Sequence, residues 1–143
     1  MRTVTAGLAL SAALLAPTAA HATPSSGVTA TPLAQGAIPA ALVSYLGDVT
    51  DFAVREVTIA PGGSSGWHYH EGRVIGLVRS GVLTHQRDNC AAQVLPAGSL
   101  VEVAPGIHDD RNLGSEPLIL DVVYLNKPGK PANQDAPAPA CEE

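Results

Sequence analysis

Glycine and proline divide this chain into short apolar segments, and that division restricts its fold more than any other feature. The 143 residues include 14 glycines and 12 prolines. Short strands at nearly regular spacing, without helix-length periodicity, predict an all-β sandwich or barrel. Residues 38–46 fit either a helical turn or an edge strand. The predicted strands are residues 52–59, 74–79, 82–86, 93–95, 100–103 and 118–125.

The first 22 residues have the pattern of a secretory signal peptide. Arg2 precedes an apolar run over residues 6–16, and Ala20-His21-Ala22 places small residues at the two positions that a signal peptidase reads. The run is shorter than the roughly 20 residues that a membrane-spanning helix needs, which argues against an N-terminal anchor. We therefore expect a secreted, extracellular protein with no membrane attachment after cleavage.

The rest of the chain predicts one domain with two flanking segments. Residues 23–49 would form an N-terminal arm, residues 50–126 the barrel, and residues 127–143 a tail rich in proline and alanine. The whole chain has 8 basic and 13 acidic side chains, so losing Arg2 with the leader leaves 7 against 13. No basic stripe is present, and nucleic acid is therefore not an expected partner.

Cys90 and Cys141 are the two cysteines of the chain. An even number in a secreted domain favours a disulfide, which would tether the tail to the barrel. Closing a loop of this size is worth up to roughly 4 kcal/mol in the chain-entropy model. Two free thiols are the alternative.

Three histidines have spacings that suit a metal site. His68 and His70 are one residue apart and would face the same side of a strand. His108 would open a later strand and approach from the opposite wall of the barrel. Neutral imidazoles suit zinc, copper, iron and nickel, and three protein ligands leave coordination positions open to water or substrate.

The residues around these histidines resemble the two motifs of the cupin family. The first motif is G(X)5HXH(X)3–4E(X)6G, and the second is G(X)5PXG(X)2H(X)3N. The second has its Pro105-Gly106 turn shifted and one residue fewer before its histidine. The resemblance covers about residues 50–125, looks like that of small secreted bacterial cupins, and implies a double-stranded β-helix, or jelly-roll barrel. Such barrels often pair through outer strands, so a homodimer is a further expectation. The matching positions are Gly62, His68, His70, Gly81, Gly98, His108 and Asn112.

Val74 stands where the family motif has its glutamate. The site therefore resembles the three-histidine cupins. Three neutral ligands would leave a divalent ion with its full charge, which makes it a strong Lewis acid and attracts anions. Glu71 is a substitute candidate, although strand parity turns it away from His70.

Asp110 and His85 are candidates for the surroundings of the metal. Asp110 shares the parity of His108 and would turn inward to hydrogen-bond a ligand, with an exposed loop aspartate as the alternative. His85 shares the parity of Leu83, which is expected to point inward. It is a fourth ligand, a pocket residue, or a hydrogen-bonded histidine of the core or surface.

These patterns predict a secreted cupin-domain protein that binds a divalent metal ion, namely Zn, Fe, Mn, Ni or Cu, through the three histidines. A small molecule would occupy an open coordination position. One alternative is a three-histidine non-haem metal dioxygenase-like oxidoreductase; another is a non-catalytic binding or structural cupin with a vestigial site. Ferrous iron is hard to keep reduced outside the cell, and only Glu71, Asp110 and His85 offer a general base. Catalysis therefore stays open, and no catalytic residue is assigned.

Overall fold

The computed structural model describes residues 22–103 and 105–140. One helix, α1 (Ala40–Leu46), lies among ten strands. The predicted signal peptide, residues 1–22, lies outside the described residues except for Ala22. No helix in the described part of the chain is long and apolar enough to cross a membrane. The strands are β1 (Ser26–Ala37), β2 (Asp51–Ser64), β3 (His68–Tyr69), β4 (Arg73–Ser80), β5 (Val82–Arg87), β6 (Ala92–Pro96), β7 (Leu100–Val103), β8 (His108–Arg111), β9 (Leu118–Asn126) and β10 (Gln134–Asp135).

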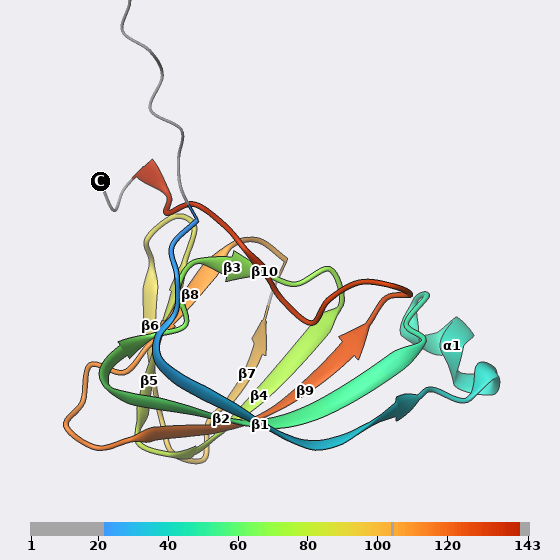
Figure 1. The fold of residues 1–143 in the computed structure, drawn as a ribbon, viewed down its shortest axis with the longest axis horizontal. Coiled ribbons are helices and arrows are strands. Elements are labelled where there is room, and N and C mark those ends of the chain that lie inside the picture. The colour runs from blue at the N-terminus through green and yellow to red at the C-terminus, as the bar shows by residue number, and fades with distance from the viewer. Residues whose placement is uncertain (1–21, 104, 141–143) are drawn as a thin grey trace, which may run out of the picture.

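The strands form one curled sheet in the order β10-β3-β8-β2-β9-β4-β7, and every pairing is antiparallel. β1 adds to β2, and β5 pairs with both β6 and β8. Figure 1 shows the sheet wrapped into a barrel, with the C-terminal segment that carries β10 crossing one end of it. The predicted all-β jelly-roll barrel is confirmed.

Strand alternation builds the core of the barrel. Along β9, Leu118, Leu120, Val122 and Tyr124 are buried, and the residues between them are less so. These four pack with side chains of β2, β4, β5 and β7 in a single apolar cluster. Burying each such side chain contributes about 1.5–3 kcal/mol. The barrel is therefore held by the inward-facing positions that the sequence pattern predicts.

The two flanking segments also carry strands. The arm predicted over residues 23–49 contains β1, which pairs along β2 from Ser26 to Ala37. The open choice at residues 38–46 is resolved as a helix, which ends at Gly47 in the left-handed conformation with φ 69°. The tail predicted over residues 127–143 contributes β10, which pairs with β3.

β2 extends beyond the strand that was predicted to end at Ile59. It continues to Ser64 through Gly62 and Gly63, because both glycines exchange backbone hydrogen bonds with Asn112, at 2.9 and 3.0 Å. The Asn112 side chain is buried, and its amide nitrogen donates to the carbonyls of Ile59 and Glu116, each at 2.8 Å. Asn112 thus fixes the chain that leads into the histidine pair.

Candidate metal centre

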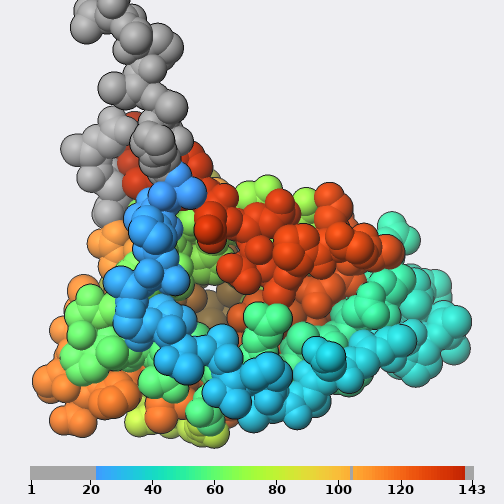
Figure 2. Space-filling model, in the orientation of Figure 1, coloured from blue at the N-terminus to red at the C-terminus, as the bar shows by residue number. Residues whose placement is uncertain are grey.

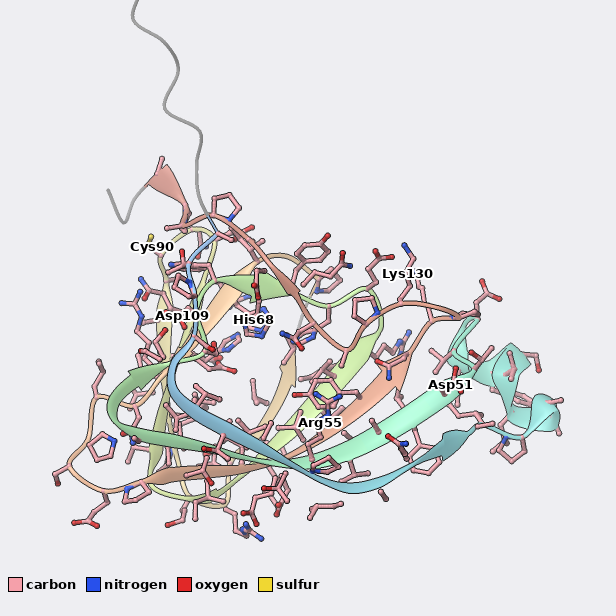
Figure 3. The ribbon with its side chains drawn as sticks, viewed as in Figure 1. Asp51, Arg55, His68, Cys90, Asp109 and Lys130 are labelled. Carbon is pink, nitrogen blue, oxygen red and sulfur yellow. The ribbon has the colours of Figure 1, made fainter. Side chains whose placement is uncertain are left out.

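The three predicted ligands lie together at one end of the barrel. One ring nitrogen from each of His68, His70 and His108 lies within 4.8 Å of the others. The ring centroids are 4.3 Å apart for His68 and His108, 4.9 Å for His68 and His70, and 5.0 Å for His70 and His108. We call these three side chains the histidine cluster. Figure 3 shows the His68 side chain projecting into the barrel.

His108 reaches the cluster from a neighbouring strand, so the expected approach from the opposite wall was wrong. β8 pairs antiparallel with β3, and His108 is the direct register partner of His68. Side chains that face each other in an antiparallel pair have Cβ atoms about 4.5–5.5 Å apart. The register therefore brings these two imidazoles together.

Backbone carbonyls orient all three imidazoles. The Nδ1 atom of His68 lies 2.8 Å from the Gly66 carbonyl oxygen, that of His70 lies 2.6 Å from the Ala132 oxygen, and that of His108 lies 3.4 Å from the Gly106 oxygen. A carbonyl oxygen only accepts, so each Nδ1 carries the proton and donates it. Each Nε2 then holds a free lone pair, which is the arrangement that a metal-binding histidine needs.

Gly66 is essential for this orientation. Its φ of +71° lies in the left-handed region, and a Cβ added there would lie 2.3 Å from the Thr23 carbonyl oxygen. Only glycine therefore allows the backbone from Thr23 to pack against the turn. The same turn presents the Gly66 carbonyl to His68.

Burial keeps two of the imidazoles neutral. Desolvation lowers the pKa of His70 to about 4, although the hydrogen bond to the Ala132 carbonyl acts in the opposite sense. Desolvation also lowers the pKa of His108 to about 3, against the attraction of Asp110. The Nε2 atom of His108 is buried and has no hydrogen-bond partner in the described part of the chain. A neutral imidazole with a buried, unused lone pair fits a metal ligand.

Asp110 and His85 form a pair beside the cluster. The Nδ1 atom of His85 donates to Oδ1 of Asp110 at 2.7 Å, and the His85 ring centroid lies 5.2 Å from that of His108. Burial alone would raise the pKa of Asp110, but the hydrogen bond from His85 and the nearby imidazoles hold it below its ordinary value. The carboxylate is only 16% exposed. An ionised carboxylate thus lies beside the histidine cluster.

Val74 and Glu71 lie outside the cluster. Val74 is buried in the core and opposes Tyr124 in the β4–β9 pairing. Oε1 of Glu71 accepts from Lys130 Nζ at 3.0 Å and from Gln134 Nε2 at 2.9 Å. Glu71 therefore holds the C-terminal segment against the loop that follows His70.

Sequence reasoning missed Asp109. Its side chain is buried, and its carboxylate accepts from Ser64 Oγ at 2.7 Å, Ser65 Oγ at 3.1 Å and Arg111 Nε at 2.6 Å. The Oγ of Ser65 also accepts from the backbone nitrogen of Asp110 at 2.8 Å. The alternation of β8 places Asp109 on the face opposite His108, where a strand pattern alone shows no partner.

Tyr124 and Arg55 were also missed, although strand alternation could have found them. The Tyr124 ring centroid lies 5.8 Å from that of His70 and 5.3 Å from Cζ of Arg55. Burial raises the pKa of the Tyr124 hydroxyl, while Arg55 acts to lower it. Both residues share inward parity with core side chains of their strands, which is the signal that the sequence carried.

Cys90 lies in the turn after β5 with a φ of 58°. No described cysteine is free, and Cys141 lies outside the described residues. The Cys90–Cys141 bridge therefore stays a prediction.

Comparison with known proteins gives the same fold. Residues 55–124 match the family model described as a cupin domain. No curated protein matches the sequence. A cupin-like protein from Thermotoga maritima is 21% identical, with a TM-score of 0.59, over 78% of this chain and 77% of its own.

Two further solved structures are similar. The cupin domain of an XRE family transcriptional regulator from Enterobacter cloacae is 22% identical, with a TM-score of 0.50, over 68% of this chain and 95% of its own. Recombinant oxalate oxidase in complex with glycolate is 21% identical, with a TM-score of 0.55, over 76% of this chain and 54% of its own. At these identities the likeness concerns the fold alone.

Proposed function

We propose that the protein, whose residues 55–124 match the cupin domain family model, binds one divalent metal ion through Nε2 of His68, His70 and His108. The remaining coordination positions are open to a small ligand. The observation that carries the proposal is the common orientation of the three rings. All three Nδ1 atoms lie against carbonyl oxygens, and the cluster offers three ring nitrogens within 4.8 Å of one another.

The cost of an empty site favours metal binding over a vestigial site. A buried polar atom without a partner costs about 1–3 kcal/mol, and Nε2 of His108 is such an atom. Burial lowers the pKa of His108 to about 3, and the neighbouring imidazoles act in the same sense, so a proton cannot serve as the partner at neutral pH. A divalent cation would relieve this cost without adding a proton.

The donor set suits Zn, Cu, Fe or Ni, and Mn is a further candidate. When bound, such an ion would supply a Lewis acid that polarises an oxygen atom of the ligand. Val74 lies in the core and supplies no negative charge. The negative charge beside the cluster is that of the Asp110 carboxylate, which accepts a hydrogen bond from His85. Asp110 and His85 thus act around the metal, and the three histidines hold it.

Metal analysis of the purified protein tests the proposal. We expect one equivalent of metal in the unaltered protein and none in the double variant His68→Ala, His108→Ala. Arg73→Met is the control, because it removes an exposed side chain outside the cluster, and it should keep its metal. A folded protein that takes up no metal from solutions of the five candidate ions would contradict the proposal.

A second candidate function is a metal-dependent oxidoreductase of the cupin dioxygenase type. The observation that favours it is the Asp110–His85 pair, because a carboxylate bonded to an imidazole beside the cluster can accept a proton from a bound substrate. Oxygen uptake by the iron-loaded protein on catechols, thiols and β-diketones tests this activity. Absence of uptake on the whole panel would leave a binding protein.

We also propose that the protein is secreted and cleaved after Ala22. The support is the sequence pattern of residues 1–22. N-terminal sequencing of the exported product should begin at Thr23. Thiol titration of the unreduced product should find no reactive thiol if Cys90 and Cys141 are bridged. The expected homodimer is decided by light scattering of the same sample.

A further inference from the structure

Arg55 is a charged side chain on the inner face of the barrel. It lies on β2 with the parity of Ala53, Val57 and Ile59, and two of these three are core residues. Its side chain is half-buried. Figure 3 shows Arg55 projecting from β2 into the barrel interior, on the side where His68 lies. A guanidinium at an inward position is unusual, because arginine is almost never buried unless it is paired.

A pocket of about 260 Å³ connects Arg55 with the histidine cluster. Its walls include Arg55, Val57, His68 and Tyr124, together with residues of β1 and of the C-terminal segment. The space-filling view shows the molecule hollowed between these two outer segments (Figure 2). The volume lies just below the range of about 300–1,000 Å³ usual for drug-sized ligands, so it suits a small one.

Arg55 forms no ion pair with a carboxylate of residues 22–103 or 105–140. Among the described residues, the ion pairs use Arg79, Arg111, Lys130 and His85 as the cations. The Arg55 guanidinium lies over the Tyr124 ring, with Cζ 5.3 Å from the ring centroid. A cation over an aromatic face gains only about 0.5–2 kcal/mol. The guanidinium N–H donors therefore remain available to a ligand.

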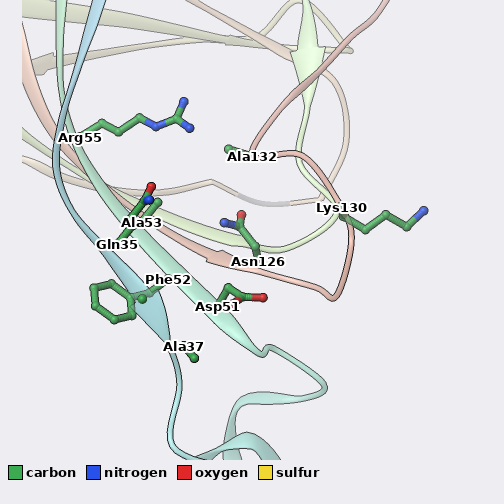
Figure 4. A pocket seen from close by; sticks show the side chains of 10 residues that line it. Gln35, Ala37, Asp51, Phe52, Ala53, Arg55, Asn126, Lys130 and Ala132 are labelled. Carbon is green, nitrogen blue, oxygen red and sulfur yellow. The ribbon is translucent and has the colours of Figure 1, made fainter.

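The second cation near this region is already paired. Arg55 and Lys130 both line a larger neighbouring pocket of about 460 Å³. Figure 4 shows Arg55 extending into the barrel and Lys130 pointing away from it. The Lys130 amine donates to Glu71 at 3.0 Å. Arg55 is thus the one positive side chain that the smaller pocket offers among the described residues.

We propose that the pocket between Arg55 and the histidine cluster is a binding site for a small organic monocarboxylate. The planar guanidinium fork pairs with a carboxylate through two parallel hydrogen bonds. Val28, Ala30 and Val57 provide apolar walls, and a low local dielectric strengthens the pair. The ligand thus belongs to the class of small carboxylic acids.

The rim of the pocket favours a single negative charge. Asp135 and Asn133 line it and are exposed. The Asp135 carboxylate repels a dianion such as phosphate, whereas Asn133 can hydrogen-bond a hydroxyl or carbonyl group at the outer end of the ligand. Phosphate sites also gather several donors or cations, and this pocket has one arginine. These features favour a carboxylate over phosphate.

The Tyr124 ring links the two ends of the site. Its centroid lies 5.8 Å from the His70 ring and 5.3 Å from Arg55 Cζ. A ligand held by Arg55 along this ring can therefore extend toward the cluster. Its contact with a metal ion rests on the proposed function, whereas its ion pair with Arg55 does not.

Calorimetric titration with glycolate tests the proposal, with the metal-free and the metal-loaded protein in parallel. The variant is Arg55→Met, and the control is Arg73→Met, which removes an exposed arginine away from the cluster. We expect Arg55→Met to weaken glycolate binding by about tenfold to a hundredfold in both forms, as for the loss of a hydrogen-bonded charge. Arg73→Met should bind as the unaltered protein does. Glycolamide, the neutral analogue, and inorganic phosphate should bind weakly to all three.

Thermal unfolding without ligand separates a binding role from a structural one. A partly buried cation without a counter-ion lowers the stability of the folded protein. Arg55→Met should therefore melt no lower than the unaltered protein. A lower melting temperature together with unchanged glycolate affinity would mean that Arg55 only packs on Tyr124, and would overturn the proposal. Glycolate binding by neither form, or equal binding of glycolamide, would also overturn it. Metal uptake is scored separately, so failure of the metal site leaves the test on the metal-free protein intact.

Discussion

Lowering the pH from 7 to 5 should destabilise the metal-free protein by about 4 kcal/mol, and His70 and His108 are the cause. Their pKa values are about 4 and about 3 in the folded protein, against 6.5 for an ordinary histidine. Between pH 6.5 and the folded values, the unfolded chain binds two protons that the folded chain does not. Stability is therefore complete above pH 6.5 and falls as the pH drops toward the folded values.

The magnitude follows from proton linkage. Over this range each histidine contributes about 2 kcal/mol, because the unfolded imidazole is almost fully protonated at pH 5 while the folded one is still mostly neutral. The sum is a large part of the 5–15 kcal/mol typical of a domain. Ordinary carboxylates titrate mostly below this window and add little to it.

Urea unfolding of the metal-free protein at pH 7 and pH 5 measures the effect. His108→Gln should keep about half of the pH dependence, and His70→Gln with His108→Gln should remove most of it. Any pH dependence of the stability that remains in the double variant comes from other groups that titrate between pH 5 and pH 7. Equal stability of the unaltered protein at the two pH values would refute the argument from buried neutral imidazoles. So would a full pH dependence in the double variant.

Three further predictions concern the framework of the site. Asn112→Ala should lower the free energy of unfolding by about 1–3 kcal/mol in urea titrations, because it leaves the buried Ile59 carbonyl and the Glu116 carbonyl without their donor; no measurable loss would contradict this. Gly66→Ala should lower the melting temperature and expose the chain near Thr23 to proteolysis, since the added Cβ would lie 2.3 Å from its carbonyl oxygen; Gly129→Ala, at a glycine of positive φ with open space, is the control. Val74→Glu should destabilise the metal-free protein through a buried carboxylate, and zinc should restore part of the loss in thermal unfolding. Equal melting with and without zinc would mean that a carboxylate at position 74 does not reach the histidine cluster.

The barrel could be predicted because short stretches of the sequence indicate its strands and their inward-facing positions. Period-two alternation marks inward positions such as Leu118 and Leu120, and glycine or proline ends most strands. The extension of β2 was not predictable, because Gly62 and Gly63 look like a turn until Asn112 pairs with them. The short helix at residues 40–46 stayed undecided for a related reason, since its seven residues are too few for a period to appear.

The candidate site followed from the sequence only in part. The spacing of His68 and His70 placed both imidazoles on one side of a strand, and the later motif added His108 to the set. The tertiary structure made His108 the register partner of His68. It also joined Asp110 to His85 by a 2.7 Å hydrogen bond.

The sequence by itself determined the all-β barrel and the histidine set, and it predicted that Val74 stands at the place of the glutamate in the cupin motif. Residue type and the alternation along a strand indicate these features, and both can be read from residues that are close together in the sequence. Only the tertiary structure decided which carbonyl orients each imidazole, and that Arg55 shares a pocket with His68. The Ala132 carbonyl that holds His70 lies 62 residues away in sequence. Contacts across such distances depend on how strands and outer segments pack, which no local pattern records.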